Sequence, residues 1–199
     1  MFLLREPSQA QINQFIFKHT ALPFPYGEVG ATNQETPAGY NLDHHRIELG
    51  QGRGTFERAC AALRNWQMFA FDWVKLHPRN APIVPTTTVA VLIQHFGFCS
   101  LNPCRIVYTI DETTAASQRF GFAYGTLPGQ AERGEERFLI EWQHADDRVW
   151  YDLLAFSRPA RWLAVLGYPL TRLLQRRFAK ASMRAMFAAV NQAAPEITS

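Results

Sequence analysis

The segment that most constrains the fold of this chain runs from Phe120 to Pro159. At its start, small and large residues alternate, the small ones being Gly121, Ala123 and Gly125 and the large ones Phe120, Phe122, Tyr124 and Thr126. A period of two requires an extended chain, in which successive side chains point to opposite faces. The pattern therefore predicts a strand with one bulky face and one nearly bare face.

A second alternating run follows after an interruption by turn residues at Leu127–Gln130. From Glu136 onward, one face carries Glu136, Phe138, Ile140 and Trp142, and the other carries Glu135, Arg137, Leu139 and Glu141. This register places the carboxyl group of Glu136 among aromatic side chains. A carboxyl group in such surroundings needs a partner or has a raised pKa, and both situations are common at functional sites.

Composition bounds the class of protein. A chain of 199 residues with 47% hydrophobic residues can bury one sizeable core. The net charge of +3, from 20 basic and 17 acidic residues, is too balanced to indicate nucleic-acid binding. The cysteines Cys60, Cys99 and Cys104 are odd in number and form no C-x-x-C pair, which predicts reduced thiols. With no signal-like start and no long apolar run, we expect a cytoplasmic protein.

Periodicity along the chain predicts an α+β protein. Helices are expected at 7–19 and 56–67, strands at 40–49, 68–76, 86–95, 105–111, 120–127, 137–144 and 149–156, and a long helix at 159–194 with a break at Gly167-Tyr168-Pro169. Runs of antiparallel strands with the helices kept apart favour this class over a parallel sheet. We expect one domain over 1–199, with a helix and an irregular segment at 1–39 and the core at 40–192.

A glycine-rich loop, Gly50-Gln51-Gly52-Arg53-Gly54, precedes the second predicted helix. Glycines before a helix can hold a phosphate, but this spacing fits neither the dinucleotide fingerprint nor the Walker pattern. We expect a turn here, with Thr55 as the cap of the helix 56–67.

The predicted C-terminal helix carries two patterns. Leu170, Leu173, Leu174 and Phe178 form an apolar stripe that should be buried against the sheet, and Arg172, Arg176, Lys180 and Arg184 form a basic row. A solvated face is the favoured interpretation of the basic row. The alternative is contact with a membrane surface, with Trp162 and Tyr168 as anchors.

Several short motifs resemble a known family. They are Tyr124–Phe138 (YGTLPGQAERGEERF), Ala155–Pro159 (AFSRP), Leu49–Gly52 (LGQG) and Asn102–Tyr108 (NPCRIVY), and they are similar to the uncharacterised domain-of-unknown-function family numbered nineteen-ninety. The resemblance spans Tyr26 to Val190. That family often has a histidine where this chain has Gln130. The order of elements also resembles the START and pollen-allergen superfamily of apolar-ligand binders, which implies a helix-grip-like fold: a curved antiparallel sheet of about seven strands wrapped on a long C-terminal helix.

Glu136 is the first candidate for a functional residue. The alternative is a structural ion pair with Arg105 or Arg158. Tyr124 could donate a hydrogen bond into the same space. The neighbours His44 and His45 point to opposite faces of one strand, so they cannot form a metal pair together. We expect no metal site and no cofactor.

These observations predict a cavity between the sheet and the last helix, and the most favoured function is binding of a small apolar or amphipathic molecule. The predicted lining residues are Phe122, Tyr124, Glu136, Phe138 and Trp142. An enzyme that uses Glu136 as a general acid or base is one alternative, and membrane or partner attachment through the basic helix is another. No nucleic acid is expected as a partner, and the sequence leaves the ligand's identity and the oligomeric state open.

Overall fold

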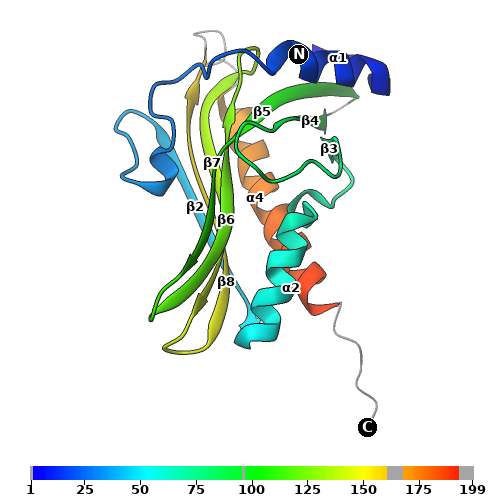
Figure 1. The fold of residues 1–199 in the computed structure, drawn as a ribbon. Coiled ribbons are helices and arrows are strands. Elements are labelled where there is room, and N and C mark those ends of the chain that lie inside the picture. The colour runs from blue at the N-terminus through cyan, green and yellow to red at the C-terminus, as the bar shows by residue number, and fades with distance from the viewer. Residues whose placement is uncertain (1, 96, 161–167, 193–199) are drawn as a thin grey trace.

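A computed structural model describes residues 2–95, 97–160 and 168–192 of the chain. Its centre is a curved antiparallel sheet in the order β2-β8-β7-β6-β5-β4-β3 (Figure 1). The strands are β2 (Asn41–Gln51), β3 (Val74–His77), β4 (Thr88–His95), β5 (Phe98–Thr113), β6 (Ser117–Thr126), β7 (Glu132–Gln143) and β8 (Arg148–Pro159). A two-residue strand, β1 (Phe2–Leu3), pairs with β5. The predicted α+β class and the predicted number of main strands, seven, are confirmed.

The register between β6 and β7 agrees with the alternation in the sequence. Phe122 lies opposite Phe138, and Tyr124 lies opposite Glu136. These pairs share the face of the sheet that is turned toward the helices, here called the concave face. The other side is called the convex face.

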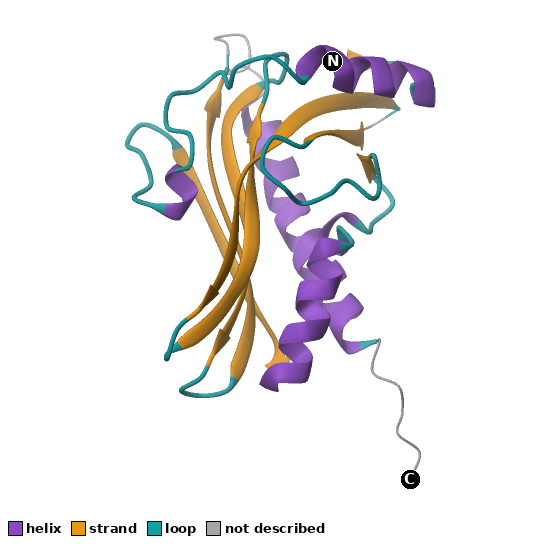
Figure 2. Ribbon diagram, in the orientation of Figure 1, coloured by secondary structure: helices purple, strands orange, loops and turns teal. Residues whose placement is uncertain are grey.

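Two long helices cover the concave face (Figure 2). They are α2 (Gly52–Arg64) and α4 (Tyr168–Asn191), and a short 3-10 turn, η2 (Gln67–Phe69), which follows α2 in the chain, packs in the same layer. A large apolar core lies between them and the sheet, and its fully buried side chains include Leu63, Met68, Phe122, Phe138 and Met186. The predicted arrangement of a curved sheet against a C-terminal helix is therefore correct.

The N-terminal segment packs elsewhere on the sheet. Helix α1 (Gln9–His19) begins with a capping box, in which Ser8 and Gln11 each bond the other's backbone N–H. Its Ile12 packs with Leu92 and Leu101 in a second, smaller core. A further 3-10 turn, η1 (Ala31–Asn33), lies on the convex side of the sheet (Figure 1).

Two predictions for the segment after β2 are wrong. Helix α2 begins at Gly52 rather than Phe56, so Thr55 lies inside the first turn and its hydroxyl donates to the carbonyl of Gln51 at 2.7 Å. The range 68–76 is not a continuous strand, because Trp66 adopts a left-handed conformation (φ 55°) and η2 follows it. Only Val74–His77 joins the sheet. The left-handed turn directs Phe69 inward under the two helices.

Helix α4 differs from its predicted apolar stripe. Leu173 is 60% exposed, whereas the fully buried positions are Ser182, Met186 and Val190. Arg172 does not belong to a solvated row, because its guanidinium forms a bidentate ion pair with Asp43 of β2. The side chain of Leu170 and the predicted anchors Trp162 and Tyr168 lie outside the described side chains. The predicted break at Gly167-Tyr168-Pro169 borders residues 161–167, which lie outside the described residues, and so it stays a prediction.

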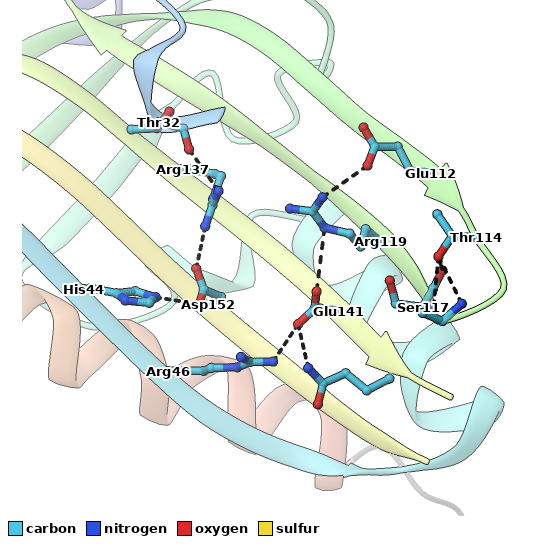
Figure 3. A network of polar contacts seen from close by, with 12 residues as sticks. Thr32, His44, Arg46, Glu112, Thr114, Ser117, Arg119, Arg137, Glu141 and Asp152 are labelled. Carbon is cyan, nitrogen blue, oxygen red and sulfur yellow. Dashed lines mark hydrogen bonds and ion pairs between the residues drawn. The ribbon is translucent and has the colours of Figure 1, made fainter. Parts of the chain in front are cut away.

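A chain of polar contacts runs along the convex face (Figure 3). Arg137 donates to the carbonyl of Thr32 and to Asp152 Oδ1, each at 2.9 Å. The other oxygen of Asp152 lies 2.7 Å from Nε2 of His44. These contacts link the N-terminal segment to β7, β8 and β2. The convex face of the sheet therefore provides polar contacts, whereas the concave face packs against apolar side chains.

Candidate functional site

A cavity of about 590 Å³ lies between the concave face and α4. Its wall is mostly apolar, with Trp73, Val91, Ile93, Leu153, Leu174 and Phe178 among its lining residues. It occupies one part of the concave face, and the solid core under α2 occupies the rest. Its volume is typical of small-molecule sites, which range from about 300 to 1,000 Å³.

Glu136 and Tyr124 provide polar groups on this wall. They are directly opposed residues of β7 and β6, and the Tyr124 hydroxyl donates to Glu136 Oε2 at 2.6 Å. Cross-strand neighbours on one face are held within contact distance by the sheet, so the pair is positioned by the backbone itself. Among the described residues, no hydrogen-bond donor reaches the second oxygen, Oε1.

Burial is the main cause of the shifted pKa values of Glu136 and Tyr124. It raises the pKa of Glu136 to about 7, although the hydrogen bond from Tyr124 lowers this pKa and so opposes part of the effect. Burial and the nearby Glu136 carboxylate raise the pKa of Tyr124 well above its ordinary value. The pair therefore comprises a phenol that keeps its proton at neutral pH and a carboxyl group that can gain or lose one.

The predicted structural ion pair of Glu136 is not present in the described part of the chain. Arg105 instead donates to the backbone carbonyls of His19, Thr20 and Leu22, each at 2.8 Å. Arg158 lies over the ring of Tyr40, 4.2 Å from its centroid.

Three of the five predicted lining residues do not reach the cavity. Phe122 and Phe138 are fully buried, because Trp66 packs against Phe122 at 4.9 Å between ring centroids and Phe69 against Phe138 at 5.9 Å. The missed turn η2 thus fills the space that these phenylalanines were expected to line. Trp142 lies outside the cavity, where its Nε1 donates to Asp147 Oδ1 at 2.8 Å.

The sequence interpretation also missed polar residues of the cavity. Glu132 lines it from the position four residues before Glu136 on β7, and burial raises its pKa. Gln175 of α4 donates to Glu132 Oε2, while the buried Oε1 has no hydrogen-bond partner in the described structure. The sequence feature that could have identified Glu132 is the period of two. It places Glu132 on the same face as Glu136 if the predicted strand is extended back through Gly134.

Glu135 faces the opposite way, as predicted from the alternation, and anchors the N-terminal segment. Its carboxylate accepts from Gly30 N–H at 2.7 Å, from Thr32 N–H at 3.1 Å and from the Tyr26 hydroxyl at 3.3 Å, and also from the Thr32 hydroxyl. The neighbours Glu135 and Glu136 therefore serve different sides of the sheet.

The two neighbouring histidines also lie on opposite faces of the sheet. His44 contacts Asp152 on the convex face, whereas His45 lines the cavity. Gln130 also lines the cavity and donates to the carbonyl of Pro103. In the ranges that the structure describes, no group of three or more His, Cys, Asp or Glu side chains could hold a metal ion.

Cys60, Cys99 and Cys104 are buried free thiols. Within the described segments, no helix combines the length and the apolar character needed to cross a bilayer.

Solved structures with the same fold define the class of protein. The hypothetical protein jhp0584 from Helicobacter pylori matches with a TM-score of 0.52 and 12% identity, over 85% of this chain and 96% of that chain. Ara h 8.0201 matches with a TM-score of 0.51 and 13% identity, over 77% of this chain and 99% of that chain. The protein has the helix-grip fold that its topology predicted.

Sequence comparison then gives the family. Residues 25–185 match the family described as "Domain of unknown function (DUF1990)". A UPF0548 protein of Dictyostelium discoideum is 38% identical over 207 residues, which cover 96% of each chain. A UPF0548 protein of Deinococcus radiodurans is 40% identical over 193 residues, covering 90% of this chain and 94% of that protein. The chain belongs to the DUF1990 family, as its motifs predicted.

Proposed function

We propose that this protein is a binding module for a small apolar or amphipathic molecule, which occupies the cavity between the sheet and α4. The observation that carries the proposal is the cavity of about 590 Å³ itself, because its wall is mostly apolar and offers a small number of placed polar groups. Sites for small molecules have this composition, in which apolar surface provides affinity and the polar groups provide orientation.

The predicted site residues have two different roles in this function, ligand contact and structural support. Tyr124 and Glu136 contact the ligand, since both line the cavity. Phe122 and Phe138 support them from the packed core beneath. Because β6 and β7 hold the Tyr124–Glu136 pair in register, the polar end of the site is organised before a ligand binds, and preorganisation reduces the cost of binding.

A fluorescent probe tests this function. We expect the neutral dye N-phenyl-1-naphthylamine to bind the protein at one site with increased emission. The variant Ala155→Phe should abolish or strongly weaken this binding, because Ala155 lines the cavity beside Glu136 and the added ring would fill it. Ala145→Phe, in the exposed turn between β7 and β8, is the matched control and should bind as the wild type does.

The folded state of each variant is checked by circular dichroism before titration. A folded wild-type protein that does not bind the dye would overturn the proposal. Equal binding by a folded Ala155→Phe protein would also overturn it, because the dye would then occupy some other surface.

A second candidate function is acid-base catalysis on the bound molecule. The observation that favours it is the position of Glu136, whose pKa of about 7 suits a group that exchanges protons near neutral pH. Its oxygen Oε1 is free of protein donors in the described structure, so a ligand donor can bind it while the single Tyr124 O–H remains bonded to Oε2.

The substitution Glu136→Gln separates the two functions, since it preserves shape but removes the acid-base group. Native mass spectrometry of protein purified from its own host would identify a co-purifying molecule. If that molecule is converted on incubation with the wild type, and Glu136→Gln binds it without conversion, the protein is an enzyme. Binding without conversion in both forms leaves the binding module as the function.

A further inference from the structure

The charged groups of the cavity have one sign. Asp43, Glu132 and Glu136 all project from the concave side of β2 and β7, and His45, Tyr124 and Cys104 are the other residues with titratable side chains that line the same space. Lysine and arginine are absent from the part of the lining that the structure describes. Glu135 belongs to the wall through its backbone, because its carboxylate is bound on the convex face.

The three carboxyl groups are not equivalent. Arg172 neutralises Asp43 through two hydrogen bonds. Glu132 receives a donor from Gln175, and its other oxygen is buried without a described partner. Glu136 has Tyr124 as its hydrogen-bond partner and no cation within ion-pair distance in the described structure. The acceptor capacity left in the cavity is therefore concentrated on β7.

This distribution discriminates between ligand headgroups. A carboxylate or phosphate next to Glu136 would place like charges together against a mostly apolar wall, which is unfavourable because the two charges repel one another. An ammonium group would instead donate a charge-assisted hydrogen bond to Oε1, which no described protein donor reaches. A buried charge is tolerated when it is paired in this way.

We propose that the cavity selects amphipathic amines, with the nitrogen at Glu136 and the apolar body against Leu153, Leu174 and Phe178, and that it rejects carboxylates and phosphates with the same body. This inference rests on the proposed binding function and names the class of ligand. The Tyr124 phenol orients the Glu136 carboxylate, so that Oε1 is presented to the ligand.

A matched series of ligands tests the selectivity. Decylamine, decanol and decanoate share a ten-carbon body and differ in the headgroup. Each is titrated, below its micelle concentration, against protein loaded with N-phenyl-1-naphthylamine at pH 8. We expect decylamine to displace the dye at a concentration at least tenfold lower than decanol, and decanoate to be the weakest of the three.

The variant Glu136→Gln assigns the effect to one side chain. It should remove most of the amine's advantage over decanol and should improve the binding of decanoate. Glu112→Gln, an exposed carboxylate on β5 outside the cavity, has the same change of charge and should leave the order unchanged. Unaltered amine preference in Glu136→Gln would overturn the assignment of the nitrogen to this residue.

The outcomes separate this inference from the function on which it rests. If the dye and the three ligands bind but decanoate equals or exceeds decylamine, the selectivity is wrong and the binding function stands. If the wild type binds neither the dye nor any of the three ligands, both proposals fail. If the dye binds and no ligand displaces it, the amine proposal is overturned.

Discussion

Tyr26 occupies the space in which a side chain on Gly125 would lie. A Cβ atom on this glycine would overlap the Tyr26 hydroxyl and would lie 2.9 Å from Phe24 Cε1. The phenol reaches across β6 at this point to donate to Glu135 of the neighbouring strand. The face of β6 that has small side chains is therefore covered at this position, because the N-terminal segment packs against it.

The substitution Gly125→Ala should destabilise the protein by about 1–3 kcal/mol, the usual cost of overpacking. Tyr26 cannot move aside easily, since it is 6% exposed and bonded to Glu135. Urea unfolding measures the change. Gly27→Ala is the control, because a Cβ atom there has no atom within 4 Å. In the background Tyr26→Ala, the cost of Gly125→Ala should be clearly smaller, and an additive result would contradict the contact.

Glu135→Ala should cost on the order of 3 kcal/mol. The reason is that the backbone donors of Gly30 and Thr32 would lose a charged acceptor in a buried position. Hydrogen exchange should accelerate at residues 26–33 before it does so in the sheet. Glu112→Ala removes an exposed ion pair with Arg119 and should change stability by less than about 1 kcal/mol. Protection at 26–33 that survives in Glu135→Ala would show that other contacts hold this segment.

Glu136 should make the protein less stable as pH rises. Burial raises its pKa from the ordinary value of 4.5 to about 7, so between these values the folded protein holds a proton that the unfolded chain has released. The free energy of unfolding therefore falls as pH rises through this window, by on the order of 2–3 kcal/mol. Urea unfolding at pH 5 and pH 8 measures it. The wild type should lose more stability between these values than Glu136→Gln, and parallel behaviour would contradict the raised pKa.

Helix α4 should tolerate substitution on one side only. Met186→Ala should cost about 2–5 kcal/mol, because this side chain is completely buried in the core. Leu173→Ala, in the same helix, should change stability by no more than about 0.5 kcal/mol, since Leu173 is 60% exposed. Thermal or urea unfolding of the two variants provides the comparison. Similar losses from both would mean that α4 is rotated relative to the sheet.

Charge reversal tests whether the basic row of α4 contacts membranes. The side chains of Arg176 and Lys180 are exposed, so Arg176→Glu with Lys180→Glu should leave folding nearly intact. We expect no sedimentation of the wild type with anionic vesicles at physiological salt, because the buried side chains of α4 face the core and are not free to enter a bilayer. Sedimentation of the wild type that the double variant loses would favour peripheral membrane attachment instead.

The sequence by itself determined most of the strands, 68–76 being the exception, and the two faces of β6 and β7. A period of two is a local property of the extended chain, so the alternation around Tyr124 and Glu136 fixed which side chains share a face before any tertiary contact was known. The same alternation placed Glu135 and Glu136 on opposite faces of one strand, and likewise His44 and His45. Motifs in the same segment identified the family, and the order of elements indicated the helix-grip fold.

The tertiary structure alone decided which part of the concave face is a cavity. Phe122 and Phe138 have the same pattern in the sequence as Tyr124, yet they are buried because Trp66 and Phe69 reach them from a segment more than fifty residues earlier in the chain. The rotation of α4, which exposes Leu173, turns Leu174 to the cavity and pairs Arg172 with Asp43, is likewise set by packing against the sheet. Periodicity specifies the direction of a side chain, but whether the space in front of it is filled depends on the volumes of elements that lie far away in the sequence.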